Sequence, residues 1–213
     1  RRWWLGRDRY KINKHKMKKI FILTLFFISS FIIFNPAYSI SPDVFIQSTV
    51  NRASQVLSEN ISKEEKINKL KLIAMETVDI KGVGFYSLGA ARKSLSDEQK
   101  SIYSNLFKNY FLKSFSSRLA EYTNPEIEVK NKQILNDNYT IVNSILIATD
   151  DRPEVKIDWR VYTKNSNNPL IRDLIIEGLS LARTQKEEFT SILNSNDGNI
   201  NALFKILEEF SNN

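Results

Sequence analysis

Residues Leu95–Tyr122, LSDEQKSIYSNLFKNYFLKSFSSRLAEY, form a long stretch with helical periodicity. Ser96 is a favourable N-cap residue and Gln99 follows three positions later, so we expect a capping box to start the helix. Apolar side chains then recur at steps of three, four and seven, which places them on one broad stripe. The stripe consists of Ile102, Tyr103, Leu106, Phe107, Tyr110, Phe111, Phe115, Leu119 and Tyr122.

At 1.5 Å per residue this helix would extend for roughly 40 Å. An apolar stripe of that length must be covered, and the strand-rich region after Asn124-Pro125 offers the only other large apolar surface. The stripe therefore predicts either a core helix packed on that region or one wall of an apolar cavity.

The excess of positive charge belongs to the first 39 residues. The whole chain has 31 Lys and Arg and 24 Asp and Glu residues. This leader contains nine of the basic residues and only one of the acidic residues, Asp8. The remaining 22 basic and 23 acidic residues give a net charge of −1. The composition therefore gives no support to nucleic-acid binding.

The leader has the pattern of a secretory signal. Lys18 and Lys19 precede an apolar run of 15 residues, Ile20 to Phe34, and Ala37-Tyr38-Ser39 supplies small residues around a cleavage site. We expect cleavage after Ser39, which makes 40–213 a single domain. The run is shorter than the roughly 20 apolar residues that span a bilayer, and an uncleaved anchor stays open as the alternative.

Met17 is the expected start of translation, so residues 1–16 are interpreted as upstream sequence.

The residue content of 40–213 excludes several kinds of site. Residues 40–213 contain no Cys, and the single His of the chain, His15, lies in the leader. A Ser-His-Asp triad, a Cys nucleophile, a disulfide and a His-ligated zinc are therefore excluded from this domain.

Helices are predicted on both sides of a strand-rich region. Before it, Ser41-Pro42 and Ser62 with Glu65 start two helices, and Gly89 closes a short third one. Four strands are predicted from runs of β-branched and aromatic residues between turn signals: Ile127–Leu135, Tyr139–Thr149, Glu154–Thr163 and Leu170–Ser180. Two helices follow, one capped by Thr184 and one over Asn199–Phe210. This order indicates an α+β domain with an antiparallel meander.

The third predicted strand alternates strictly between apolar and polar residues. Its apolar face, which should be buried, consists of Val155, Ile157, Trp159 and Val161. In the second strand both faces are apolar, so both should be covered. Asp173 and Glu177 would lie roughly 13 Å apart on one strand, too far for an acid/base pair, and we expect them to bind Arg, Lys or backbone groups. Gly178 should mark a bend.

A family resemblance emerges from the same region. The run Asp173-Leu174-Ile175-Ile176-Glu177-Gly178-Leu179-Ser180-Leu181, with Phe189 eight residues later, resembles the D-V-x-x-E-G-V-S-L…Q-F signature of the MlaC, or toluene-tolerance, family. Upstream positions match in the same order: Asp79, Leu88-Gly89, Ser96 to Gln99, Phe107 and Arg118-Leu119 to Tyr122. The chain departs from the family at Pro169-Leu170-Ile171-Arg172, where W-K-V-Y is usual, and at Ala90-Ala91-Arg92, where aromatic residues are usual.

The resemblance implies a fold and a function. The fold is α+β, with a curved antiparallel sheet of about four strands packed by N-terminal and C-terminal helices around an apolar cavity. The function is that of a periplasmic phospholipid carrier. It would move lipid between an outer-membrane lipoprotein–porin complex and an inner-membrane ABC transporter complex, and so maintain outer-membrane lipid asymmetry. Such a carrier is expected to be a monomer and not an enzyme, with phospholipid as cargo, no cofactor or metal, and no nucleic-acid partner.

A carrier needs a dry slot, because each exposed CH₂ costs about 0.8 kcal/mol and two acyl chains carry on the order of 20 kcal/mol. The long helix and the apolar sheet face are the expected walls. The predicted lipid-binding residues are Phe85, Leu88, Phe107, Phe111, Ile145, Ile147, Ile157, Trp159, Val161, Leu174 and Ile176. The alternative is a small enzyme on a curved-sheet scaffold of the ketosteroid-isomerase kind, with an Asp or Tyr inside an apolar cone.

Overall fold

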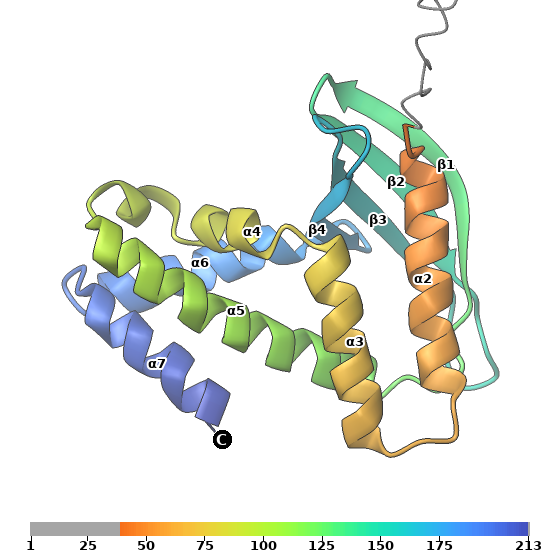
Figure 1. Ribbon diagram of the computed structural model, residues 1–213, viewed down its shortest axis with the longest axis horizontal. Coiled ribbons are helices and arrows are strands. Elements are labelled where there is room, and N and C mark those ends of the chain that lie inside the picture. The colour runs from red at the N-terminus through yellow and green to blue at the C-terminus, as the bar shows by residue number, and fades with distance from the viewer. Residues whose placement is uncertain (1–38, 213) are drawn as a thin grey trace, which may run out of the picture. The chain divides into compact units, whose positions relative to one another are not determined.

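The long helix (Figure 1) starts as predicted, and the capping box of Ser96 and Gln99 is in place. The Gln99 N–H donates to Ser96 Oγ at 3.1 Å, and the Ser96 N–H donates to Gln99 Oε1 at 3.0 Å. The computed structural model describes residues 39–212. The predicted signal therefore lies outside the described residues, except for Ser39.

Twelve elements follow one another along the described chain. The elements before the sheet are α2 (Pro42–Ser58), α3 (Lys63–Thr77), α4 (Ile80–Ser87), the short 3₁₀ helix η1 (Gly89–Lys93) and α5 (Asp97–Leu119). The strands are β1 (Ile127–Asn136), β2 (Tyr139–Leu146), β3 (Val155–Tyr162), β4 (Leu170–Ile176) and β5 (Leu179–Ser180), and the last helices are α6 (Leu181–Asn194) and α7 (Ile200–Asn212). Within residues 39–212 no helix combines the length and the apolar character needed to cross a membrane.

The sheet is an antiparallel meander of five strands in the order β1-β2-β3-β4-β5, which confirms the α+β prediction. The predicted fourth strand is interrupted at Glu177-Gly178. Both residues have a left-handed backbone, with φ of 48° and 82°, and they form the tight turn between β4 and β5. The bend predicted at Gly178 is thus a two-residue hairpin turn.

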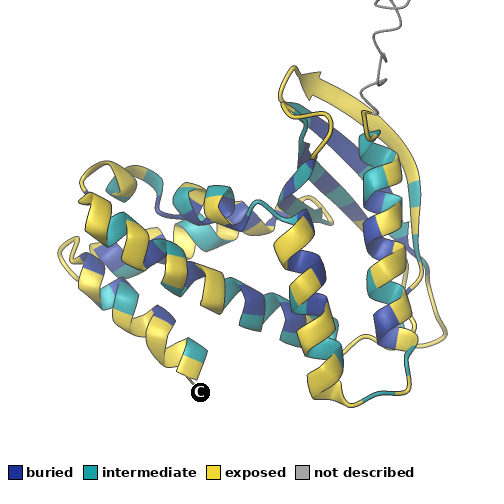
Figure 2. Ribbon diagram, in the orientation of Figure 1, coloured by how far each residue is buried: buried dark blue, intermediate teal, exposed yellow. Residues whose placement is uncertain are grey.

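Helix α2 covers the predicted apolar face of the sheet (Figure 1). Ile46 and Val50 of α2 pack against this face, and the strand residues that face α2 are mostly buried (Figure 2). The register places Trp159 opposite Val142. The Trp159 indole N–H donates to Ser144 Oγ at 2.9 Å, and that hydroxyl donates to the Ile157 carbonyl at 2.9 Å. The indole is therefore held by a hydrogen bond as well as by packing.

The prediction that α5 packs on the sheet is wrong. Helix α5 packs on α3, α4 and α7, and α2 takes the place on the sheet. Tyr103 and Phe107 are buried on one side of α5, whereas Leu112 and Ser116 are buried on the other. At about 100° per residue, Leu112 lies about 140° and Ser116 about 180° from Phe107 around the helix axis. The helix therefore buries different faces in its two halves.

Helix α6 begins three residues before the predicted cap at Thr184. Ser180 is the N-cap, since its hydroxyl accepts from the Arg183 N–H at 3.1 Å. A Ser that ends a strand and caps a helix at once gives an ambiguous signal in the sequence, and the strand pattern concealed the cap.

Helices α4 and α5 approach closely at Gly84. The Tyr103 hydroxyl donates to the Gly84 carbonyl at 2.8 Å, and a Cβ on Gly84 would lie 2.7 Å from Phe107 Cδ1. The glycine therefore permits the approach of the two helices.

Gly84→Ala is expected to destabilise the protein by about 1–2 kcal/mol, because the added methyl displaces the Phe107 ring in a packed core. Helix propensity alone would give the opposite sign, by about 1 kcal/mol. Urea unfolding followed by Trp159 emission measures the change. Combining the substitution with Phe107→Leu should cost less than the sum of the two single changes. A stabilised Gly84→Ala protein would show that the contact is loose.

Candidate functional site

Eight of the eleven predicted lipid-binding residues lie in two separate apolar clusters. The helical cluster is formed mainly by α4, α5, α6 and α7, and it contains Phe85, Leu88, Phe107 and Phe111. The sheet cluster is formed by α2 and the strands, and it contains Ile157, Trp159, Val161 and Leu174. Ile145, Ile147 and Ile176 are partly buried and belong to neither cluster.

The helical cluster is built around aromatic rings. The Phe107 ring lies 5.7 Å from that of Tyr103 and meets the Phe189 ring edge-on at 6.2 Å. Phe111 stacks on Phe115 with ring centroids 5.4 Å apart and an interplanar angle of 11°. Phe111 and Phe115 are only partly buried, and we call this pair the aromatic ledge.

Val78, at the junction of α3 and α4, packs against both clusters. It connects the aromatic side of the helices with the apolar face of the sheet. We call the contact of the two clusters at Val78 the seam. Leu174 of β4 packs against the sheet cluster and, like the residues of the aromatic ledge, is only partly buried.

Polar contacts hold the seam at the α3–α4 junction. Val78 forms a parallel bridge with Ile171, and the Asp79 N–H donates to the Ile171 carbonyl at 2.9 Å. Arg172 donates from Nε and Nη2 to Asp79 Oδ2 at 2.7 and 2.6 Å. These contacts fasten the start of α4 to β4.

Arg172 has two further contacts on the sheet. Its Nη1 donates to the Tyr139 hydroxyl at 2.6 Å, and its guanidinium carbon lies 3.9 Å from the Tyr162 ring centroid. The carboxylate of Asp79 also caps α4 by accepting from the Gly82 N–H at 2.9 Å. Arg172, a departure from the family pattern, is therefore a central residue of the junction between helices and sheet.

The carboxylates predicted to bind Arg, Lys or backbone groups do so. Asp173 is buried and accepts from the Ser180 hydroxyl at 2.6 Å and from the Ala182 N–H at 3.0 Å, with Arg160 Nη1 at 3.6 Å. Glu177 accepts from the Lys156 N–H. Both groups are therefore used in fixing the backbone.

The buried tyrosines are also held in structural contacts. Burial raises the pKa of Tyr103, whose hydroxyl donates to a backbone carbonyl. Burial and, to a lesser extent, the Glu188 charge raise the pKa of Tyr110, whose hydroxyl donates to Gln185 at 3.0 Å. Both hydroxyls stay protonated at neutral pH. Within residues 39–212 there is also no group of three or more His, Cys, Asp or Glu that could hold a metal ion.

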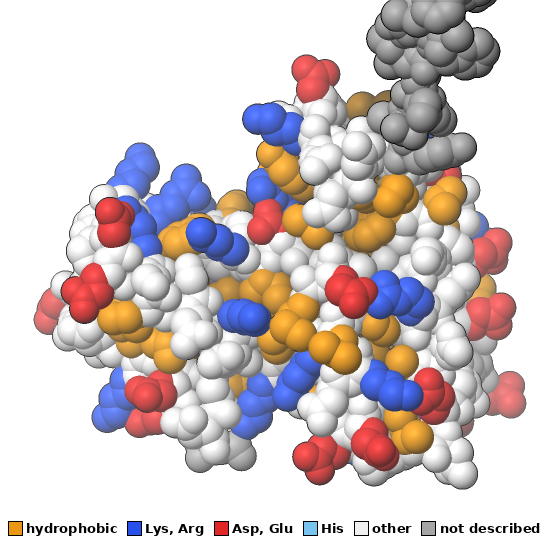
Figure 3. All heavy atoms as spheres, in the orientation of Figure 1, with side chains coloured by type: hydrophobic (Ala, Val, Ile, Leu, Met, Phe, Trp, Pro, Cys, Tyr) orange, Lys and Arg blue, Asp and Glu red, His pale blue; other side chains and the backbone are white. Residues whose placement is uncertain are grey.

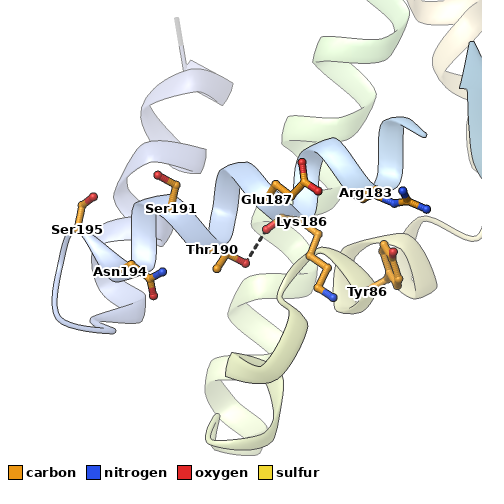
Figure 4. A pocket seen from close by; sticks show the side chains of 8 residues that line it. All are labelled: Tyr86, Arg183, Lys186, Glu187, Thr190, Ser191, Asn194 and Ser195. Atoms are coloured by element: carbon orange, nitrogen blue, oxygen red, sulfur yellow. Dashed lines mark hydrogen bonds between the residues drawn. The ribbon is translucent and has the colours of Figure 1, made fainter. Parts of the chain in front are cut away.

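Two open hollows are present, and none of the eleven predicted residues lines either of them. One, of about 680 Å³, lies between α4 and α6 and has Tyr86, Arg183 and Lys186 in its wall (Figure 4). The other, of about 260 Å³, lies between α2 and the start of β1.

Sequence reasoning missed several residues of the two clusters. Val78 had no periodic signal, because it lies between two helices. Ile46 and Val50 belong to the first helix, and the contact of that helix with the sheet depends on the tertiary fold. Phe115 lay on the stripe of the long helix, and Val142 on an apolar strand face, so the sequence carried a signal for both.

Comparisons with known proteins identify relatives of this chain and a solved structure with a similar fold. The chain is 25% identical to the intermembrane phospholipid transport system binding protein MlaC of Haemophilus influenzae, over 192 residues that cover 86% of this chain and 89% of that protein. Its fold is similar to that of a phospholipid-binding protein from Ralstonia solanacearum, solved in complex with a phospholipid. The TM-score is 0.69 at 18% identity, and the match covers 81% of this chain and 97% of the other.

The family comparison covers most of the chain. The sequence model of the MlaC protein family matches residues 47–209, from the first turns of α2 to the last turns of α7. This range includes the helical cluster, the seam, every predicted lipid-binding residue and all of the sheet cluster except Phe45 and Ile46. The chain therefore belongs to the MlaC family.

Proposed function

We propose that this protein is a phospholipid carrier whose acyl-chain slot forms at the seam between the helical and sheet clusters. The observation that carries the proposal is the pair of apolar clusters that share Val78 and leave the aromatic ledge partly exposed beside them. Membership of the MlaC family supports the same assignment.

The acyl chains lie between the ledge on α5 and the apolar face of the sheet. Because α5 packs on other helices, the two clusters can separate without breaking the packing of α5 on α3, α4 and α7. Burial of two acyl chains supplies on the order of 20 kcal/mol, which offsets the loss of contacts along the seam. The junction of Asp79 with Arg172 stays closed and acts as the fixed end.

The wall of this slot consists of the eight predicted lipid-binding residues that lie in the two clusters, with Val78 and Phe115 added. We further propose that the signal is cleaved after Ser39 and that residues 40–213 are a single lipid-binding domain in the periplasm. There the carrier exchanges phospholipid with an inner-membrane ABC transporter complex and an outer-membrane lipoprotein–porin complex, and this exchange maintains outer-membrane lipid asymmetry.

Protein expressed as the full chain and purified after export is expected to carry phospholipid. Native mass spectrometry should show the mass of residues 40–213 with one or more phospholipid masses added, since cargo buried from water dissociates slowly. Organic extraction and lipid analysis identify the cargo. A protein that emerges empty, or with a small polar ligand, would contradict the carrier and favour the enzyme alternative.

A further inference from the structure

The groove between α4 and α6 lies away from the seam and needs a different explanation. Its α6 wall carries Arg183 and Lys186 near one end and polar residues such as Ser191 and Asn194 toward the other (Figure 4). Tyr86, 40% exposed, contributes an aromatic ring from α4. Every residue that lines the groove has a polar or charged side-chain group, so the groove does not suit acyl chains.

Lys186 is fixed in place although it has no acidic partner. Its ammonium lies 5.4 Å from the Tyr86 ring centroid, and its side chain passes over Gly89, where an added Cβ would come within 3.0 Å of Lys186 Cε. In the part of the chain that the structure describes, neither Lys186 nor Arg183 has a carboxylate within 4.0 Å. Eight other cations do have such a partner.

Positive charge continues beyond the groove. Lys81 of α4 and Arg92 and Lys93 of η1 are exposed, and Figure 3 shows Lys and Arg side chains gathered over α4 and η1. The groove itself contains one acidic residue, Glu187. Because residues 40–213 together carry a net charge of −1, this is a local concentration of positive charge.

The polar wall offers free hydrogen-bonding groups. Among residues 39–212, the side chains of Ser191, Asn194 and Ser195 have no hydrogen-bond partner. They follow one another on the groove side of α6, at positions i, i+3 and i+4, and so form a short row along the helix. A row of amide and hydroxyl groups can bind the peptide groups of an extended chain.

We propose that the α4–α6 groove binds an acidic, extended peptide segment of a partner protein. Carboxylates of the segment pair with Arg183 and Lys186, and its backbone lies along the polar row. A concave groove fits a protruding segment better than a flat lipid surface. The inference rests on the proposed function, in which a carrier must dock on protein complexes, and it names the docking surface and the charge of the partner segment.

The test uses the exported, purified protein and a fluorescein-labelled peptide of alternating Glu and Ser, with binding followed by anisotropy at low salt. The double substitution Arg183→Glu with Lys186→Glu should weaken binding by about tenfold or more. The matched control, Lys63→Glu with Lys164→Glu, makes the same change of net charge at exposed positions outside the groove and should change binding by less than about twofold. Ser191→Trp fills the groove without changing charge and should also block the peptide.

If both double variants weaken peptide binding equally, the peptide is attracted by net charge alone and the proposal is wrong. The proposal is also wrong if the wild-type protein does not bind the peptide. Vesicles of phosphatidylglycerol form a second arm. If the groove variants lose vesicle binding but keep peptide binding, the surface is a membrane contact and the proposal is wrong. Should the charge-reversed protein fail to fold, Ser191→Trp decides the matter.

Phospholipid retention is measured on the same preparations, and the groove variants should retain as much as the wild type. If the wild-type protein binds the peptide but holds no phospholipid, only the carrier proposal is contradicted. If it holds phospholipid but does not bind the peptide, only the groove proposal is contradicted.

Discussion

Phe111→Asp is expected to reduce retained phospholipid by about 100-fold or more. Phe111 belongs to the aromatic ledge, where it stacks on Phe115 and lies 6.1 Å from the Phe107 ring. A carboxylate there would face the acyl chains, and a charge placed in an apolar site costs several kcal/mol. Each 1.4 kcal/mol is about a tenfold change in affinity.

Phospholipid per protein, measured by native mass spectrometry after export and purification, gives the result. Ile102→Asp is the matched control, because Ile102 is 44% exposed on the same helix and lies outside the helical cluster. Phe111→Leu keeps the ledge apolar and should retain lipid. If Phe111→Asp folds and still carries the wild-type amount of phospholipid, the slot is not at the seam.

Asp173→Ala is expected to lower the free energy of unfolding by about 2–4 kcal/mol. Its carboxylate joins β4 to the start of α6, since it accepts from the Ala182 N–H and from the hydroxyl of the N-cap residue Ser180. Removal leaves a buried N–H without a partner and takes away a negative charge at a helix N-terminus. Arg160 contributes less, because its side chain is 36% exposed and can be hydrated when the carboxylate is gone.

Urea unfolding followed by Trp159 emission measures this loss. Asp173→Asn keeps an acceptor for the Ala182 N–H and should cost about 1–2 kcal/mol. Asp150→Ala, at an exposed turn, should change stability by less than about 0.5 kcal/mol. An Asp173→Ala protein as stable as Asp150→Ala would mean that α6 is anchored by its apolar contacts alone.

The strands and the long helix were readable from the sequence because their signals are local. The alternation of Ile157, Trp159 and Val161 gave the buried face of β3, and the Ser96 and Gln99 spacing gave the start of α5. Turn residues gave the order of the hairpins. Each of these features depends on residues within a few positions of one another, where propensity and period act directly.

The sequence did not show which helices and strands pack against one another. A single stripe was assumed for α5, but Leu112 and Ser116 are buried opposite Phe107, because a helix between neighbours on different sides has two buried faces. The sheet face was identified, yet nothing in its pattern names α2 as the covering helix. For the candidate site, eight of the eleven predicted residues lie in the two clusters, whereas the seam at Val78 depends on how the two clusters meet.

The cover of the sheet by α2 has a consequence for folding. The strands form a meander of local hairpins, but Val50 of α2 precedes the first residue of β1 by 77 positions. Hairpins close quickly, and contacts over long loops form later. Docking of α2 is therefore expected to be a late event, and until then the sheet exposes a continuous apolar face. A folding intermediate with such an exposed apolar face is prone to aggregate. Docking of α2 covers this face and so protects the protein from aggregation.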